Sequence, residues 1–236
     1  MNIIITGASR GIGAETAKSL ACKYNVNMIL IARDPDKLER LAEDIKQQYP
    51  QTTIYPYAFD LKDPTHLKEL LVFIHSKWDH LDILINNAAF LKHTPVTEME
   101  VDDLENHYSV NLFSPFMLIV KLFNLLNKSQ IKHIINVGTM GAVQGSKKFS
   151  GLSAYSSSKA ALANLTEMLA EEWKAYDVRV NYLALGAVST EMFKEAFPGK
   201  RASMAPEDIA DYIAEFAVSG WQYFNGKILP ISKSTP

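Results

Sequence analysis

Short apolar runs alternate with longer segments of helical periodicity along the whole chain. Seven runs rich in β-branched residues occupy residues 3–5, 28–31, 53–59, 81–85, 133–137, 179–183 and 227–231. They are apolar almost throughout rather than at every second position, which is typical of strands buried on both faces of a parallel sheet. Helical spacing is found between them, over residues 14–23, 36–48, 65–77, 101–127, 153–174 and 206–217.

A glycine-rich turn follows the first of these strands. Residues 6–13 read TGASRGIG, and the first helical segment comes directly after them. Gly7, Gly11 and Gly13 allow a tight turn, close approach of the backbone to a diphosphate, and close packing of helix on strand. The free amides at the helix start suit an anion. Such a pattern alone is as often an ordinary turn, but its place in the first strand–helix unit predicts a dinucleotide site.

Repeated strand–helix alternation predicts an α/β fold with a doubly wound, mostly parallel sheet of about seven strands and helices on both faces. No proline- or serine-rich linker, repeat or low-complexity tract interrupts the alternation. We therefore predict a single Rossmann-fold domain over residues 1–236. Its cofactor-binding half covers about residues 1–137, and its catalytic and substrate-binding half covers about residues 138–236.

Composition and charge exclude several other classes of protein. The 24 Lys and Arg residues against 26 Asp and Glu give a net charge of −2, so a nucleic-acid partner is not expected. Cys22 is the single cysteine, which excludes an internal disulfide and a cysteine zinc site. The six histidines form no short-range ligand pair, so we predict no metal. Without a secretory signal or a membrane span, we expect a cytoplasmic protein with no membrane partner.

Arg33 indicates which dinucleotide binds. A residue about twenty positions after the glycine turn reads the adenosine ribose, and an acid there selects NAD(H). In this chain that position is Arg33, which suits a 2′-phosphate, and Arg10 within the turn adds a second cation. We therefore predict NADP(H) in preference to NAD(H). The alternative is that Arg33 is a solvated loop charge and Asp34 binds the ribose.

Tyr155 and Lys159 are the candidate acid–base pair. A four-residue step on a helix places both side chains on one face, one turn apart. A phenol with a pKa near 10 is a poor acid or base at neutral pH unless a neighbouring positive charge favours its anion. Lys159 and an oxidised nicotinamide would supply that charge. Taken alone, the YSSSK segment is most often a surface tyrosine and lysine.

With these motifs in order, the chain resembles the short-chain dehydrogenase/reductase family over essentially its whole length. The segment TGASRGIG matches the family's glycine turn, and YSSSK matches its YxxxK pair. Residues Asn86–Ala89 match its NNAG motif, and RVNYLALG matches its RVNxxxPG segment. The resemblance implies that Tyr155 is the general acid in reduction and the general base in oxidation. Lys159 would bind the nicotinamide ribose and lower the pKa of Tyr155, while Asn111 would hold a water that links Lys159 to solvent.

The same resemblance implies further cofactor contacts. Asp60 would contact the adenine, although it could equally cap the turn that follows it. Gly186, Val188 and Thr190 would border the nicotinamide amide and the diphosphate. We also expect cofactor contacts from Ser9, Ile12, Leu61, Asn87 and Ala88.

Three positions depart from the family pattern. The catalytic serine is replaced by Thr139, which keeps the hydroxyl but adds a β-branched methyl group. Ser146 and Ser150, in the loop before Tyr155, are alternative hydroxyl donors. Ala89 replaces a glycine, and Leu185 replaces a proline.

The sequence gives less information about the substrate and about the oligomeric state. After Thr190, an apolar lid would consist of Met192, Phe193, Phe197 and Met204, with Lys194, Lys200 and Arg201 toward an acidic substrate. A mobile loop with solvated charges is the equal alternative. The resemblance implies a homodimer or homotetramer through the helices at about residues 101–127 and 153–174.

We therefore predict an NADP(H)-dependent oxidoreductase that transfers hydride between the nicotinamide and a small carbonyl or alcohol substrate. The alternative from another class is an NADP(H)-binding sensor or scaffold with little turnover, which the three departures motivate. Sugar-nucleotide epimerase or dehydratase chemistry is less favoured, because no second substrate domain follows the sixth strand.

Overall fold

A seven-stranded parallel sheet organises the computed structural model, which describes residues 1–233. The strands are β1 (Asn2–Thr6), β2 (Asn27–Ala32), β3 (Thr53–Ala58), β4 (Ile83–Asn86), β5 (His133–Thr139), β6 (Arg179–Leu185) and β7 (Ile228–Ile231). Their order is β3-β2-β1-β4-β5-β6-β7, and every neighbouring pair is parallel. The predicted single-domain Rossmann fold is thus confirmed, and a sheet predicted to be mostly parallel is parallel throughout these strands.

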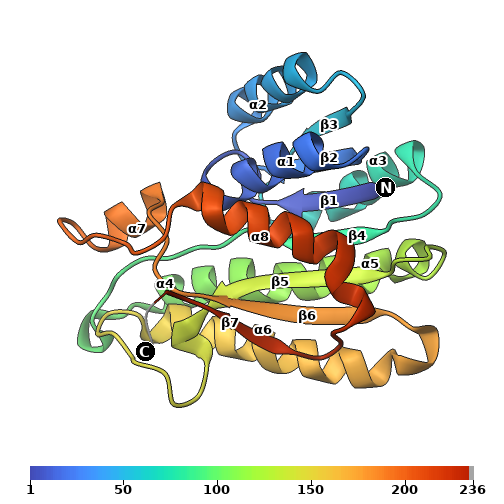
Figure 1. The fold of residues 1–236 in the computed structure, drawn as a ribbon. Coiled ribbons are helices and arrows are strands. Elements are labelled where there is room, and N and C mark those ends of the chain that lie inside the picture. Colours follow the sequence, from blue (N-terminus) through green and yellow to red (C-terminus); the bar gives the residue numbers. More distant parts are fainter. Residues whose placement is uncertain (234–236) are drawn as a thin grey trace.

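Helices cover both faces of the sheet (Figure 1). They are α1 (Gly11–Lys23), α2 (Pro35–Gln48), α3 (Leu67–Lys77), α4 (Val101–Tyr108), α5 (Ser114–Leu126), α6 (Ser153–Glu172), α7 (Glu191–Ala196) and α8 (Pro206–Ser219). Side chains of α1, α2 and α8 share one buried cluster with the strands, whereas α3, α5 and part of α6 share another. This is the two-sided cover that right-handed strand–helix–strand connections produce.

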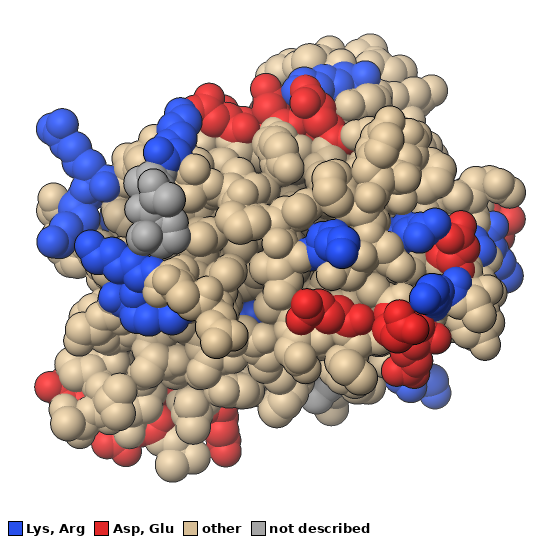
Figure 2. Space-filling model, turned by 60° about the horizontal axis from the view of Figure 1, so that its bottom comes forward, with Lys and Arg blue, Asp and Glu red and all other residues tan. Residues whose placement is uncertain are grey.

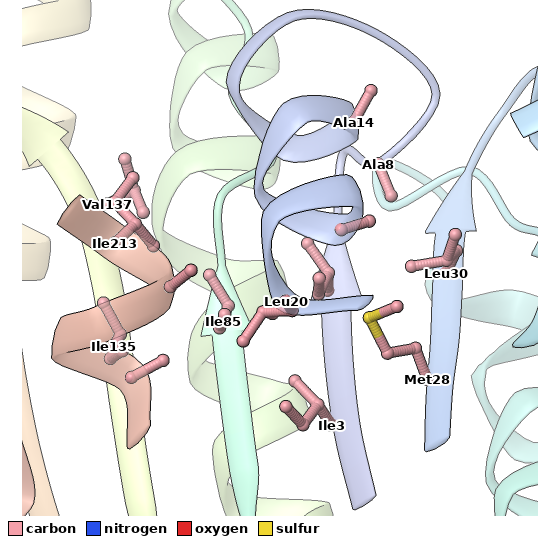
Figure 3. Close-up of a cluster of buried hydrophobic side chains, with 14 of the residues drawn as sticks. Ile3, Ala8, Ala14, Leu20, Met28, Leu30, Ile85, Ile135, Val137 and Ile213 are labelled. Carbon is pink, nitrogen blue, oxygen red and sulfur yellow. The ribbon is translucent and has the colours of Figure 1, made fainter. Parts of the chain in front are cut away.

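The first buried cluster fixes the helix that follows the glycine turn. Ala14 and Leu20 of α1 lie against Ile3, Met28 and Ile85 of the sheet (Figure 3). Small side chains on this face of α1 let the helix lie close to β1, which holds the amide groups at its first turn directly beyond the strand end.

The long segment predicted as one helix over 101–127 is interrupted. A π-helical turn, Ser109–Phe113, separates α4 from α5 and contains the buried Asn111. A wide turn of this kind shifts the backbone hydrogen bonds by one residue and is often found at functional sites. Periodicity did not reveal it, because one extra residue leaves the apolar pattern on either side unchanged.

The segment Val101–Leu126 has the length and apolar composition of a membrane-spanning helix. The core helix of a soluble protein has the same properties, and Leu118, Ile119 and Leu122 of α5 are buried against the sheet. The absence of a membrane partner stays a prediction.

Two further elements differ from the sequence prediction. Helix α1 begins three residues before the predicted start, and α7 forms within a segment for which no helix was predicted.

Candidate active site

A cleft of about 1520 Å³ lies at the carboxyl ends of the strands, where β1 and β4 are neighbours and the chain order reverses direction. Ligands of open α/β sheets bind at this position. Most of the predicted site residues line the cleft although they come from distant parts of the chain: Gly7, Ser9, Arg10, Gly11, Ile12, Arg33, Asp60, Leu61, Asn87, Ala88, Thr139, Tyr155, Lys159, Gly186, Val188 and Thr190.

Two of the predicted residues, Gly13 and Asn111, do not line the cleft. A Cβ atom on Gly13 would lie 2.4 Å from the carbonyl oxygen of Gly7, so this glycine permits the close packing of α1 on the turn. Asn111 is fully buried. Its Nδ2 donates to the Phe90 carbonyl oxygen and to Ser158 Oγ, and its Oδ1 accepts from the Phe90 amide. The Asn111 side chain therefore holds the loop after β4, and its role in a water relay stays a prediction.

The glycine turn presents free backbone amides to the cleft. Gly7 and Gly11 have φ values of +67° and +56°, which favour glycine. Arg10 precedes α1 in an extended conformation, and its side chain makes no capping hydrogen bond. The first amides of α1 therefore have no side-chain partner from the cap, which is the arrangement that binds phosphate groups at helix starts.

Asn87 holds this turn in place from the neighbouring strand. Its Nδ2 donates to the carbonyl oxygens of Thr6 (2.9 Å) and Gly7 (3.2 Å). In return, Thr6 Oγ1 accepts from the backbone amides of Asn87 and Ala88, both at 3.1 Å. Both amide protons of the Asn87 side chain are thus used within the protein, so a cofactor contact of this residue would come from its carbonyl oxygen or its backbone.

Four charged side chains predicted for the adenosine end, Arg10, Arg33, Asp34 and Asp60, differ in their partners. Arg10 Nη1 lies 2.6 Å from Glu191 Oε2 and 3.6 Å from Glu195, and the contact with Glu191 raises the pKa of Arg10. Arg33 is exposed and forms no ion pair with any residue of the described range 1–233. Asp34 accepts from the Lys37 amide and caps α2, and Asp60 accepts from the Lys62 amide. Arg33 is therefore the free cation of this set.

Thr139, Tyr155 and Lys159 line the same cleft. Lys159 Nζ is fully buried and donates to the Val137 carbonyl oxygen at 2.9 Å, and burial lowers its pKa to about 7. Burial raises the pKa of the half-buried Tyr155 to about 12. In the protein alone desolvation opposes the charge on both groups; the lowering of the Tyr155 pKa by Lys159 and an oxidised nicotinamide stays a prediction.

Thr139 is placed to donate its hydroxyl proton. It ends β5, and its Oγ1 accepts from the Gly141 amide at 3.2 Å. Because a hydroxyl has one proton and two lone pairs, this contact leaves the proton for another acceptor. The alternative Ser146 is 9% exposed, donates to the carbonyl oxygens of Met140 and Val143, and does not line the cleft. Ser150 does line it, on an exposed loop.

Sequence reasoning missed Tyr182, which lies directly behind Thr139. Its ring occupies the space above Gly138, where a Cβ atom would be 1.8 Å from Tyr182 Cζ. The Tyr182 hydroxyl oxygen accepts from the Thr139 amide at 3.0 Å, and burial raises the pKa of this phenol. The sequence does contain a signal for this contact, namely a glycine near the end of one predicted strand and a tyrosine within the next. Parallel pairing of β5 and β6 places Gly138 opposite Ala184, so Gly138 lies diagonally beside Tyr182 on one face of the sheet.

The outer wall of the cleft differs in part from the predicted apolar lid. Met192, Phe193 and Phe197 line the cleft, whereas Met204 is 4% exposed and belongs to the core cluster under α8. Met204 also pairs with Val188 in an isolated bridge, which ties the end of this segment to the sheet. His93, from the loop after β4, was not predicted and contacts the Phe197 ring. Within residues 1–233 no group of three His, Cys, Asp or Glu side chains could hold a metal.

Comparison with known proteins agrees with this geometry. A family model described as short chain dehydrogenase matches residues 1–201. An uncharacterized oxidoreductase of Staphylococcus saprophyticus is 32% identical over 209 residues, covering 88% of this chain and 87% of the relative. An NADP-dependent 3-hydroxy acid dehydrogenase of Schizosaccharomyces pombe is 28% identical, with 89% and 84% covered.

The fold also matches solved structures. A short chain dehydrogenase from Escherichia coli CFT073 complexed with NADPH superposes with a TM-score of 0.86 and 27% identity, covering 97% of this chain and 95% of that one.

Proposed function

Because the chain belongs to the short-chain dehydrogenase family, we propose that this oxidoreductase uses NADP(H) to reduce a small carbonyl compound, or to oxidise the corresponding alcohol. One observation carries the proposal: a single cleft joins the glycine turn after β1 to Thr139, Tyr155 and Lys159. A dinucleotide held at the turn would place its nicotinamide toward these side chains.

The residues present fit such a cofactor. A Cβ atom on Gly7 would lie 2.7 Å from Ala88 Cα, so a side chain at this position would crowd the crevice between β1 and β4. The uncapped start of α1 offers backbone amides to a diphosphate. The NADPH and NADP complexes of similar short chain dehydrogenases support the same cofactor class.

We assign recognition of the 2′-phosphate mainly to Arg33. Its guanidinium has no carboxylate partner among residues 1–233, whereas that of Arg10 is paired with Glu191. A free arginine gains more from a phosphate than one already neutralised by an acid. Isothermal titration with NADPH and NADH measures the preference. Arg33→Gln should weaken NADPH binding about tenfold or more and leave NADH binding nearly unchanged. Tighter binding of NADH than of NADPH by the unaltered protein would refute the assignment.

The side chains suit the reduction of a carbonyl. A bound reduced nicotinamide supplies hydride to the carbonyl carbon. With a pKa of about 12, Tyr155 is protonated at neutral pH and donates a proton to the carbonyl oxygen. Thr139 donates a hydrogen bond to the same oxygen, because its own oxygen already accepts from Gly141. Lys159, held by the Val137 carbonyl oxygen, orients the nicotinamide ribose and restores the proton to Tyr155.

The test is Tyr155→Phe, followed by NADPH absorbance with a panel of aldehydes and ketones. The phenylalanine ring keeps the packing but lacks the proton, so the rate should fall at least about a hundredfold while NADPH binds as before. An unchanged rate would end the proposal. The second candidate, a sensor that binds NADP(H) with little turnover, is favoured by the departures from the family pattern at Thr139, Ala89 and Leu185. Tight NADPH binding without oxidation against any carbonyl would support it.

We also propose a homodimer or homotetramer through α4–α5 and α6. Large apolar side chains on these helices are exposed, and they include Val101, Phe113, Phe116, Val120 and Met168. Exposed large apolar side chains on these helices suit a subunit interface. Light scattering should give the mass of a dimer or tetramer, and Phe116→Lys with Met168→Lys should reduce it to a monomer. A monomer in the unaltered protein would refute the proposal.

A further inference from the structure

An aromatic cluster lines part of the cleft. It consists of His93, Phe149, Phe193 and Phe197, which come from three separate segments of the chain. The Phe197 ring centroid lies 5.2 Å from that of Phe193, 5.7 Å from His93 and 6.4 Å from Phe149. Phe149 is 54% exposed, so the cluster is open to a ligand rather than part of the core. An apolar segment of a substrate has a surface to pack on here.

Four cations surround this aromatic cluster. Lys147, Lys194, Lys200 and Arg201 line the same cleft and are exposed. Lys147 Nζ lies 5.6 Å from the Phe149 ring centroid. None of the four forms an ion pair with a carboxylate of the described residues, 1–233. The cleft's acid on this wall, Glu191, is paired with Arg10 at 2.6 Å.

The gathering of positive charge is local. The chain as a whole carries a net charge of −2, so four cations around one opening do not reflect a general excess. Of the four, Lys194 also acts on Glu191 and contributes to lowering its pKa. In Figure 2, Lys and Arg side chains gather on the left of the molecule, the side where α7 lies in Figure 1. Like charges held close together repel one another, and a bound anion relieves that repulsion while forming charge-assisted hydrogen bonds.

We propose that the substrate is an amphipathic carbonyl compound with an anionic group at the end away from the carbonyl. The carbonyl lies at Thr139 and Tyr155, the apolar middle packs on the aromatic cluster, and a carboxylate or phosphate lies at the four cations. This inference rests on the proposed function. It assigns the cations to the substrate and not to the cofactor, because they border the aromatic cluster. Lys147 lies over the Phe149 ring, and Lys200 and Arg201 follow Phe197 within four residues, whereas the cation of the glycine turn, Arg10, is already paired with Glu191 and Glu195 of α7.

Matched substrates test the charge directly. The probes are straight-chain ω-oxo carboxylates of increasing length, each compared with its methyl ester, which has the same aldehyde but no charge. NADPH absorbance gives kcat/KM for both. The double variant Lys200→Gln with Arg201→Gln removes two of the four cations. The control, Lys46→Gln with Lys68→Gln, removes the same charge from two exposed residues that do not line the cleft.

We expect the carboxylate to exceed its ester by about tenfold in kcat/KM at the chain length that spans the cleft. The preference should shrink at high salt, since exposed cations are screened. It should disappear in the Lys200/Arg201 variant and persist in the control. Equal kcat/KM for carboxylate and ester at every length would overturn the inference. So would a variant that weakens NADPH binding and slows both substrates alike, because the cations would then serve the cofactor.

Failure of the proposed function is distinguishable from failure of this inference. If NADPH is not oxidised with any probe, the proposed function fails. A binding measurement without turnover then tests whether the cations hold an anionic ligand. Dodecanoate and dodecanol are titrated into the NADPH complex and followed by NADPH fluorescence. Tighter binding of dodecanoate that is lost in the Lys200/Arg201 variant supports the anionic site. Equal binding of the two, or no binding of either, overturns it.

Discussion

Gly138 and Tyr182 should behave as one unit in stability measurements. The two residues lie on neighbouring strands, and the Tyr182 ring fills the place that a side chain at position 138 would take. Gly138→Ala introduces a methyl group there. Tyr182→Ala empties the same space. The double variant introduces the methyl group into the space already vacated.

The distances set the expected magnitudes. The new Cβ atom would lie 1.8 Å from Tyr182 Cζ and 2.4 Å from its Cε2, so the ring must move by about 1.6 Å to reach an ordinary contact of 3.4 Å. Seven paired positions hold β5 and β6 in register, which restricts that movement. We expect Gly138→Ala to cost about 3 kcal/mol, at the upper end for overpacking. Tyr182→Ala should cost about 3–5 kcal/mol, as for other buried aromatic residues.

The double variant should then cost no more than Tyr182→Ala alone, which gives a coupling energy of about 3 kcal/mol. Urea unfolding followed by circular dichroism measures all four free energies of unfolding. As a matched control, Tyr182→Phe keeps the ring and removes only the hydroxyl. Combined with Gly138→Ala it should show a smaller coupling energy than Tyr182→Ala does, because the clash with Cζ remains although the hydroxyl oxygen, also 1.8 Å from the new Cβ atom, is gone. If Gly138→Ala and Tyr182→Ala add within about 0.5 kcal/mol, the ring does not occupy the space beside Gly138 and the reasoning is wrong.

Three further predictions concern a buried base, the glycine turn and α7. Burial lowers the pKa of His133 to about 4. In the unfolded chain the pKa of this histidine is near 6.5, so below that pH the unfolded state binds a proton that the folded state does not. The free energy of unfolding should therefore fall by about 2 kcal/mol between pH 7 and pH 5. Urea unfolding at both pH values measures this difference, which should be absent in His133→Gln. Gly13→Ala, whose Cβ atom would lie 2.4 Å from the Gly7 carbonyl oxygen, should weaken NADPH binding in isothermal titration at least about tenfold. Unchanged affinity would contradict the role of the turn. Glu191→Gln removes the nearer of the two acids paired with the exposed Arg10 and leaves Glu195 at 3.6 Å. It should change the free energy of unfolding by less than about 1 kcal/mol but raise the affinity for NADPH relative to NADH.

The sequence was sufficient for the fold because the signals that determine it are local and repeated. Runs such as residues 28–31 are apolar on both faces, and only a sheet covered on both sides buries them. The glycine turn also marks its own place, since Gly7 and Gly11 adopt backbone angles that few other residues tolerate. The π-helical turn at Asn111 and the short α7 depend on tertiary contacts, so no periodicity could indicate them.

The sequence predicted which residues form the candidate site, but not which charged groups pair there or how burial shifts their pKa values. Sixteen of the predicted residues line one cleft. The sequence could not show that Arg10 pairs with Glu191, because the two residues are 181 positions apart. Nor could it give the directions of the pKa shifts. A tyrosine and a lysine one helical turn apart suggest mutual stabilisation of charge, but the spacing does not show that both groups are buried and that burial raises the pKa of Tyr155 and lowers that of Lys159.

The effect of having threonine rather than the family's serine at position 139 depends on buried neighbours of this residue. The backbone amide of Thr139 donates to the hydroxyl of Tyr182, a residue 43 positions later in the chain. Tyr182 fits there only because position 138 has no side chain. The hydroxyl proposed to contact the substrate is therefore held by a strand end whose shape depends on Gly138 and Tyr182 together. A serine at position 139 would keep this backbone contact, whereas a side chain at position 138 would displace the Tyr182 ring and with it the partner of the Thr139 amide. Position 138, and not the exchange of serine for threonine, thus sets the geometry at this end of the cleft.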